Sequence, residues 1–170
     1  MIIHGDNLEA LKALLPQYEG RVKCIYIDPP YNTGNEKWCY NDNVNDPHIQ
    51  KWLGEVVGKE GEDLTRHDKW LCMMYPRLML LQKLLADDGF IFVSIDVFEY
   101  AYLRCIMDEI FGSANFRNCI AVRRGIKNVQ AQFDEVQSLS LGHEYIYLYS
   151  KNPQAKLPKL SKGFEADKAG

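Results

Sequence analysis

The sequence predicts an α/β fold: a mainly parallel sheet with helices on both faces and an antiparallel pair of strands near the C-terminus. Two segments, "VKCIYIDP" (22–29) and "FIFVSID" (90–96), are continuous apolar runs with β-branched residues, which is typical of strands buried on both faces. Helical patterns alternate with them, and this order favours parallel strands joined by helices. A chain of 170 residues is one domain, or a piece of a larger one, with room for a proper core.

The other elements follow from the same kind of pattern. The apolar period of an amphipathic helix occurs three times, at 7–15, 69–88 and 97–112. Further strands are predicted at three places, 1–6, 116–124 and 143–151. Pro76 predicts a kink or restart in the second helix, and Gly89 and Gly112 predict helix ends. Residues 35–69 are polar and aperiodic, and a loop of that length is usually functional or mobile.

The composition limits the class of protein. Hydrophobic residues make up 46% of the chain and charged residues 25%, as in an ordinary globular protein. The N-terminus has neither a basic leader nor a long apolar segment, so we expect no signal peptide and no membrane span. The cysteines are odd in number, at five, and none forms a C-x-x-C pair. This disfavours a disulfide framework and structural zinc, so we predict no metal site and a cytoplasmic location.

The charge is divided unevenly along the chain. The net charge is −3, but residues 1–115 carry 11 Lys and Arg against 18 Asp and Glu, whereas residues 116–170 carry 9 against 5. The split is either an accident of a solvated surface or a basic C-terminal region that faces an anion such as a phosphate backbone. Composition alone leaves both interpretations open.

The string "DPPYNTG" directly follows the first buried run. Ligands of open α/β sheets bind at the carboxyl ends of the strands, so Asp28 lies where a substrate is expected. Pro29 and Pro30 keep the backbone extended and have no N–H, which leaves a stiff row of acceptors around Asp28. Such a row suits the exocyclic amino group of a nucleobase, and Tyr31 offers a flat face for an unstacked base. A proline pair by itself would favour a simple turn; the full string favours a site.

The string and its surroundings resemble the amino-group DNA methyltransferases, which use S-adenosylmethionine and carry a D-P-P-Y motif. "DPPYNTG" has the form found in adenine-specific members. The blocks "HGDNLEALKALL", "RLMLLQKLLADDGFIFVSID", "EYAYLRCIMDEIFG" and "HEYIYLYSKN" resemble, in the same order, segments of the modification subunits of type III restriction systems. The resemblance covers residues 2–152 and implies a partial Rossmann-like methyltransferase fold with the beta-type order of motifs.

The resemblance also implies roles for the motif residues. The carboxylate of Asp28 and the carbonyl of Pro29 accept hydrogen bonds from the target amino group, and both residues lie beside the cofactor. Pro30 and Tyr31 complete the catalytic motif, and the ring of Tyr31 stacks on the flipped base. Methyl transfer is then an in-line displacement that depends on the positions of the reactants more than on a strong base.

Residues outside the motif have two interpretations each. Asp6 resembles a cofactor-contacting acid of the family, with Asn7 beside it, or it caps the following helix, with an acid three residues further on. Asp96 either contacts the cofactor or, as we favour, caps the helix that follows it. His143 and Glu144 are expected to serve the structure at the start of a strand, although in the family this block lies near the target-base pocket.

The sequence departs from the family pattern in one respect. It contains no F-x-G-x-G string, the glycine-rich loop that holds the methionine end of the cofactor, and the glycine cluster "GEVVGKEGED" does not have the spacing of a phosphate loop. In the permuted motif order the glycine-rich loop lies C-terminal to the target-recognition region. We therefore expect residues 1–152 to be the N-terminal part of a catalytic domain and residues 153–170 to be a linker or the start of target recognition.

The first hypothesis is a site-specific DNA adenine-N6 methyltransferase of a restriction-modification system, inactive as this chain alone. It would use S-adenosylmethionine, act on double-stranded DNA, and assemble with a restriction subunit and a second modification subunit. The acid at position 28 favours adenine, because cytosine-specific relatives more often carry Ser there. The alternatives are a non-catalytic fragment that contributes a binding or assembly surface, and a methyltransferase acting on N4 of cytosine or on RNA.

Overall fold

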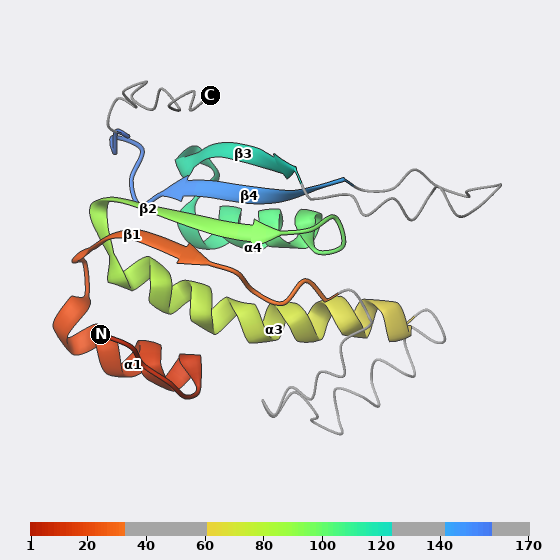
Figure 1. The fold of residues 1–170 in the computed structure, drawn as a ribbon, viewed down its shortest axis with the longest axis horizontal. Helices are drawn as coiled ribbons and strands as arrows, with labels where there is room; N and C mark the ends of the chain where they lie inside the picture. Colours follow the sequence, from red (N-terminus) through yellow and green to blue (C-terminus); the bar gives the residue numbers. More distant parts are fainter. Residues whose placement is uncertain (33–60, 124–141, 158–170) are drawn as a thin grey trace, which may run out of the picture.

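The computed structural model describes residues 1–32, 61–123 and 142–157. Its elements in chain order are α1 (Asn7–Tyr18), β1 (Val22–Ile27), α3 (Gly61–Leu84), β2 (Leu85–Ile95), α4 (Tyr100–Phe111), the short 3-10 helix η2 (Ser113–Asn115), β3 (Phe116–Arg123) and β4 (His143–Ser150). Figure 1 shows α3 running along the sheet, with α1 beside the end of α3 that leads into β2. The order confirms the predicted α/β fold class.

The described strands form one mixed sheet in the order β1-β2-β4-β3. β1 and β2 are parallel, as predicted for strands joined through a helix, and α3 lies in the connection between them. β4 is antiparallel to both of its neighbours, which confirms the predicted antiparallel pair as β3 and β4. Because β4 enters the sheet between β2 and β3, parallel pairing among the described strands is confined to β1 and β2.

The hydrophobic core lies between one face of this sheet and the helices α3 and α4. Strand residues at alternate positions point into it, and those with no exposed surface are Ile91, Val93, Ile95, Tyr147 and Tyr149. From the helices come Trp70, Leu78, Leu103 and Met107. The described residues therefore show helix cover on a single face, whereas cover on both faces was predicted.

The two predicted buried strands differ in their surroundings. Most residues of β2 are buried on both faces, as predicted. In β1 only Ile25 is buried, and Tyr26 is 59% exposed. β1 is an edge strand of the described sheet, and the described helices cover only the face that carries Ile25.

Three predictions about element boundaries are wrong. Residues 1–6 form no strand and lead into α1. The helix predicted from residue 69 already begins at Gly61 and continues through Pro76 to Leu84. Gly89 does not end a helix but lies inside β2, where an added Cβ would come within 2.9 Å of the carbonyl oxygen of Ala86.

The predicted end of the third helix at Gly112 is confirmed. Gly112 ends α4 with φ of +87°, a conformation that favours glycine, and its N–H donates to the carbonyl of Asp108. Pro76 lies within α3, and Nη1 of Arg77 donates to the carbonyl of Met73 in the preceding turn at 2.7 Å. No helix in the described part of the chain is long and apolar enough to cross a membrane.

Candidate active site

The D-P-P-Y segment, residues 28–31, leaves the carboxyl end of β1 beside a cavity of about 320 Å³. Asp28 is exposed and Pro29 is buried, and both line the cavity together with Pro30. The volume is at the lower end of the range for small-molecule sites. The other walls come from α1, β1 and α3; their polar residues are Asn7 and Arg77, and their apolar residues include Met73 and Met74. Asp28 thus lies at the strand end where the sequence predicted a site.

The carbonyl of Pro30 is held by α3. Nε1 of Trp70 donates to it at 2.7 Å, and Trp70 has no exposed surface. This bond directs the oxygen of Pro30 toward the helix. The acceptors expected at the rim of the cavity are therefore the carboxylate of Asp28 and the carbonyl of Pro29, and their role toward a substrate stays a prediction.

Tyr31 is bonded through its hydroxyl. The hydroxyl donates to Oε2 of Glu144, at the start of β4, at 3.2 Å. Burial, and next the negative charges of Asp28 and Glu144, raise the pKa of Tyr31, so it remains a protonated donor at neutral pH. The ring is partly buried against the core. Glu144 is thus brought to the motif, whereas His143 bonds locally, with Nε2 at 2.8 Å from the hydroxyl of Tyr145.

The residue after the motif belongs to a polar cluster that the sequence analysis missed. Nδ2 of Asn32 donates to Oε1 of Glu99 at 2.5 Å, and Nδ1 of His67 lies 2.7 Å from the same oxygen. Glu99 has no exposed surface. A glutamate inside an otherwise apolar segment ("VFEYAY") is the one signal that could have marked it, because a buried acid is rare unless it is paired.

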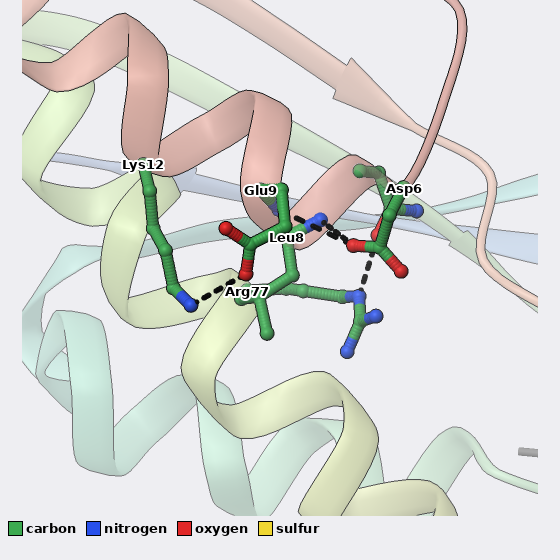
Figure 2. A network of polar contacts seen from close by, with 6 residues as sticks. Asp6, Leu8, Glu9, Lys12 and Arg77 are labelled. Atoms are coloured by element: carbon green, nitrogen blue, oxygen red, sulfur yellow. Dashed lines mark hydrogen bonds and ion pairs between the residues drawn. The ribbon is translucent and has the colours of Figure 1, made fainter. Parts of the chain in front are cut away.

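Asp6 caps α1. Its Oδ1 accepts from the backbone N–H groups of Leu8 at 2.8 Å and Glu9 at 3.2 Å, and these bonds lower the pKa of Asp6. Figure 2 shows Arg77 reaching from α3 to this turn, where its Nε donates to Oδ1 of Asn7 at 2.7 Å. Asn7 lines the cavity and Asp6 does not. The helix-cap interpretation of Asp6 is confirmed, and contact of either residue with a cofactor stays a prediction.

Asp96 does not cap the following helix. α4 begins at Tyr100, with Glu99 as its N-cap residue, whereas Oδ1 of Asp96 accepts from the N–H of Phe98 at 2.9 Å. The carboxylate closes a turn just ahead of the helix. The predicted cap is wrong because α4 begins later in the chain than predicted. Asp96 is nearly buried and is not part of the cavity wall.

The basic C-terminal region is described only in part. Arg117 of β3 is engaged within the fold, since it donates to Oγ of Ser150 and to the carbonyls of Asn152 and Pro153. The basic residues between 124 and 141 and beyond 157 lie outside the described residues, as does most of the glycine cluster at 54–63. The interpretation of this region as a surface for an anion stays a prediction.

Residues 22–168 match the DNA methylase family. The chain is 40% identical over 175 residues to the Mod subunit of the type III restriction-modification enzyme StyLTI of Salmonella typhimurium, covering 96% of this chain and 26% of that protein. It is 43% identical over 152 residues to the probable HindVI Mod subunit of Haemophilus influenzae. This alignment covers 89% of this chain and 17% of that protein. The solved M1.HpyAVI–SAM complex matches with a TM-score of 0.54 at 15% identity, over 95% of this chain and 62% of that one, which shows the fold.

The chain belongs to the DNA methylase family. Within that family it is similar to the Mod subunits of type III restriction-modification enzymes, and the predicted resemblance is confirmed. The chain spans about a quarter or less of the length of these curated relatives.

Proposed function

We propose that this chain is the D-P-P-Y-bearing part of a site-specific DNA methyltransferase that methylates N6 of adenine. The observation that carries the proposal is the place of the motif: Asp28 and Pro29 lie at the carboxyl end of β1, on the rim of a cavity. Membership of the DNA methylase family supports the class of reaction. The acid at position 28 supports adenine as the target base.

The residues around the cavity fit S-adenosylmethionine as the cofactor. Met73 and Met74 give an apolar wall, the carboxylate of Asp28 complements a positive charge, and Arg77 and Asn7 can hydrogen-bond polar groups. We assign Asn7, Asp28 and Pro29 to cofactor binding, with Asp6 acting beside them at the start of α1. When bound, S-adenosylmethionine supplies an electrophilic methyl group on a sulfonium.

The motif residues position the acceptor nitrogen. The amino group of a flipped adenine donates one hydrogen bond to the carboxylate of Asp28 and one to the carbonyl of Pro29. These bonds aim the lone pair of the nitrogen along the line of displacement, and each is worth a few kcal/mol when it strengthens in the transition state. The ring of Tyr31 stacks on the base and offsets part of the cost of flipping.

The relatives suggest the setting of the reaction. They are Mod subunits of type III restriction-modification enzymes. We propose that the protein acts on double-stranded DNA in the cytoplasm, with a restriction subunit and a second modification subunit as partners. The alternatives remain a non-catalytic fragment and a methyltransferase acting on N4 of cytosine or on RNA.

The test is methyl transfer from labelled S-adenosylmethionine to plasmid DNA by the full-length protein that contains this chain. Asp28→Ala should lower kcat about 10²–10³-fold and leave DNA binding unchanged, because the acceptors act on the transition state. Asp87→Ala, at another exposed aspartate, is the matched control.

The methylated nucleoside is then identified by mass spectrometry after digestion. N6-methyladenine is the expected product, whereas N4-methylcytosine or labelled RNA would favour the alternative enzymes. An inactive wild-type protein would favour the non-catalytic fragment. Transfer at the wild-type rate by Asp28→Ala would rule out the role given to this carboxylate.

A further inference from the structure

The segment that follows the motif has an unusual backbone. Asn32 has φ of +53°, and it is the one non-glycine residue with positive φ in the described part of the chain. Residues other than glycine rarely adopt this conformation, although asparagine tolerates it better than most. Such a conformation persists when the surroundings hold it. Here the side chain is held by the 2.5 Å bond from Nδ2 to Oε1 of Glu99.

Glu99 binds the loop and does not cap its own helix. It is the N-cap residue of α4, yet its side chain makes no hydrogen bond to the start of that helix. Its Oε1 instead accepts a hydrogen bond from Nδ2 of Asn32 and lies 2.7 Å from Nδ1 of His67 on α3. A carboxylate with no exposed surface costs free energy unless polar partners compensate. The cluster therefore joins the loop after β1, the helix α3 and the turn after β2.

His67 is itself held in place. Its ring stacks on that of Tyr102 of α4, with centroids 4.2 Å apart and planes at 22°, and its side chain is 12% exposed. His67 and Trp70 are three residues apart and so share one face of α3. That face holds the motif at two points, through Trp70 at the carbonyl of Pro30 and through the cluster at Asn32. Tyr31 lies between the two points.

We propose that Glu99 is a positioning residue, which acts through Asn32 to fix the D-P-P-Y segment against α3. The inference rests on the proposed methyltransferase function. Asp28, four residues before Asn32, must present its acceptor to a nitrogen that reacts in line, and an error of about 1 Å can cost about 10²-fold in rate. A loop that is fixed only where it leaves β1 would not hold Asp28 in such a position. The hydrogen bonds at Pro30 and Asn32 fix the loop at its other end.

The first experiment separates the side chain of Asn32 from its backbone. Asn32→Gly keeps the positive φ at no steric cost and removes the amide. In the full-length protein, at a temperature where the variant is folded, its kcat for methyl transfer should fall about 10²-fold with KM for DNA unchanged. The thermal midpoint should fall somewhat as well, because Glu99 loses one of its polar partners. Glu109→Gln, on the exposed side of α4 where Glu109 accepts from Tyr75, is the matched control and should behave as the wild type.

The second experiment asks whether Glu99 acts through Asn32. Glu99→Gln keeps an acceptor oxygen and should retain more activity than Glu99→Ala. Asn32→Gly combined with either Glu99 variant should lose no more than the more damaged single variant, because residues that act as a unit are not additive. If Glu99→Ala does not fold, the comparison of Glu99→Gln with the double variant Glu99→Gln/Asn32→Gly is sufficient for this test.

A readout without catalysis completes the design. In the chain itself, hydrogen exchange of the Trp70 indole N–H, assigned by its loss in Trp70→Phe, reports the bond to Pro30. Exchange should speed up in Asn32→Gly and stay unchanged in Glu109→Gln. Full kcat in Asn32→Gly, multiplicative losses in the double variant, or unchanged indole exchange would each overturn the positioning role. An inactive wild type would overturn the proposed function, while the exchange result would still decide whether Asn32 holds the segment.

Discussion

Tyr31 uses two parts of one side chain for different contacts. The hydroxyl donates to Glu144, and the ring is partly buried against the core. The proposed stacking on a flipped base needs the ring alone. The two contributions can therefore be separated by removing one oxygen atom.

We predict that Tyr31→Phe retains most of the methyl-transfer rate and that Tyr31→Ala loses far more. Stacking on an aromatic ring is worth about 1–3 kcal/mol per base, and Phe preserves it. The measurement is single-turnover methylation of duplex DNA, compared with binding to DNA that has a mismatch at the target base. Binding to the mismatch should suffer less in Tyr31→Ala than catalysis does. Tyr18→Phe, at an exposed tyrosine of α1, is the control. Equal damage by Phe and Ala would mean that the hydroxyl matters and that stacking is the wrong account.

At Asp6, the hydrogen bonds that cap the helix can be tested separately from the negative charge of the carboxylate. Asn caps a helix about as well as Asp, so Asp6→Asn should keep the thermal midpoint of the chain at neutral pH, whereas Asp6→Ala should lower it. The pKa of Asp6 is lowered by its bonds to the backbone. The cap is thus at full strength above the ordinary pKa of the carboxyl group and weakens as the pH falls through the lowered value.

The measurement is thermal unfolding of the three proteins by circular dichroism between neutral and acid pH. The difference between the wild type and Asp6→Asn should change only at the acid end. An Asp6→Asn variant that is stable but defective in cofactor binding would support the proposed cofactor contact. Equal midpoints for the wild type and Asp6→Ala would contradict the cap.

At the scale of elements, α3 builds both halves of the site with one face. His67 and Trp70 hold the D-P-P-Y segment, and Met73, Met74 and Arg77 line the cavity. Their spacing of three and four residues follows the turn of the helix. The continuation of α3 through Pro76 therefore matters for the site, because it keeps Arg77 on the same face as Trp70.

The join between α3 and β2 gives a prediction about the fold. Gly89 lies within β2, and a methyl group there would come within 2.9 Å of the backbone oxygen of Ala86. Gly89→Ala should destabilise the chain by about 1–3 kcal/mol, as overpacked positions do. Urea unfolding measures this, with Ser113→Ala at an exposed position as the control. A stability equal to that of the wild type would show that the backbone at Gly89 relaxes freely.

At the scale of the whole molecule, the described part of the cavity has walls from α1, β1 and α3. The sequence contains no F-x-G-x-G string, the element that the family uses for the methionine end of the cofactor. Small-molecule sites normally enclose most of their ligand. The described walls would therefore give S-adenosylmethionine only part of an enclosure.

We predict no methylation by this chain alone and no binding of S-adenosylmethionine or S-adenosylhomocysteine at micromolar concentrations. Each 1.4 kcal/mol of lost contact is about tenfold in affinity, so the loss of several would bring the dissociation constant to about millimolar or weaker. Isothermal calorimetry measures it, after circular dichroism has shown that the chain is folded. M1.HpyAVI, solved as a SAM complex, is the positive control. A micromolar dissociation constant would show that the described walls are sufficient.

The sequence by itself determined the features that depend on local pattern. Apolar runs predicted β1 and β2, and the helical period and Gly112 predicted α4 and its end. The "DPPYNTG" string, in its order with other blocks, predicted the family. These predictions succeeded because periodicity, turn residues and motifs are properties of neighbouring residues.

The tertiary structure decided what depends on partners distant in the chain. A strand at residues 1–6 would have to pair with a neighbouring strand, and in the structure these residues do not join the edge of the described sheet. Asn32 and Glu99 are 67 residues apart in the sequence, and His67 and Glu99 are 32 residues apart. No local sequence pattern could therefore predict the cluster. Glu99 could be recognised as a buried carboxylate only after β1, α3 and the turn before α4 had been brought together, because burial and pairing arise from that assembly.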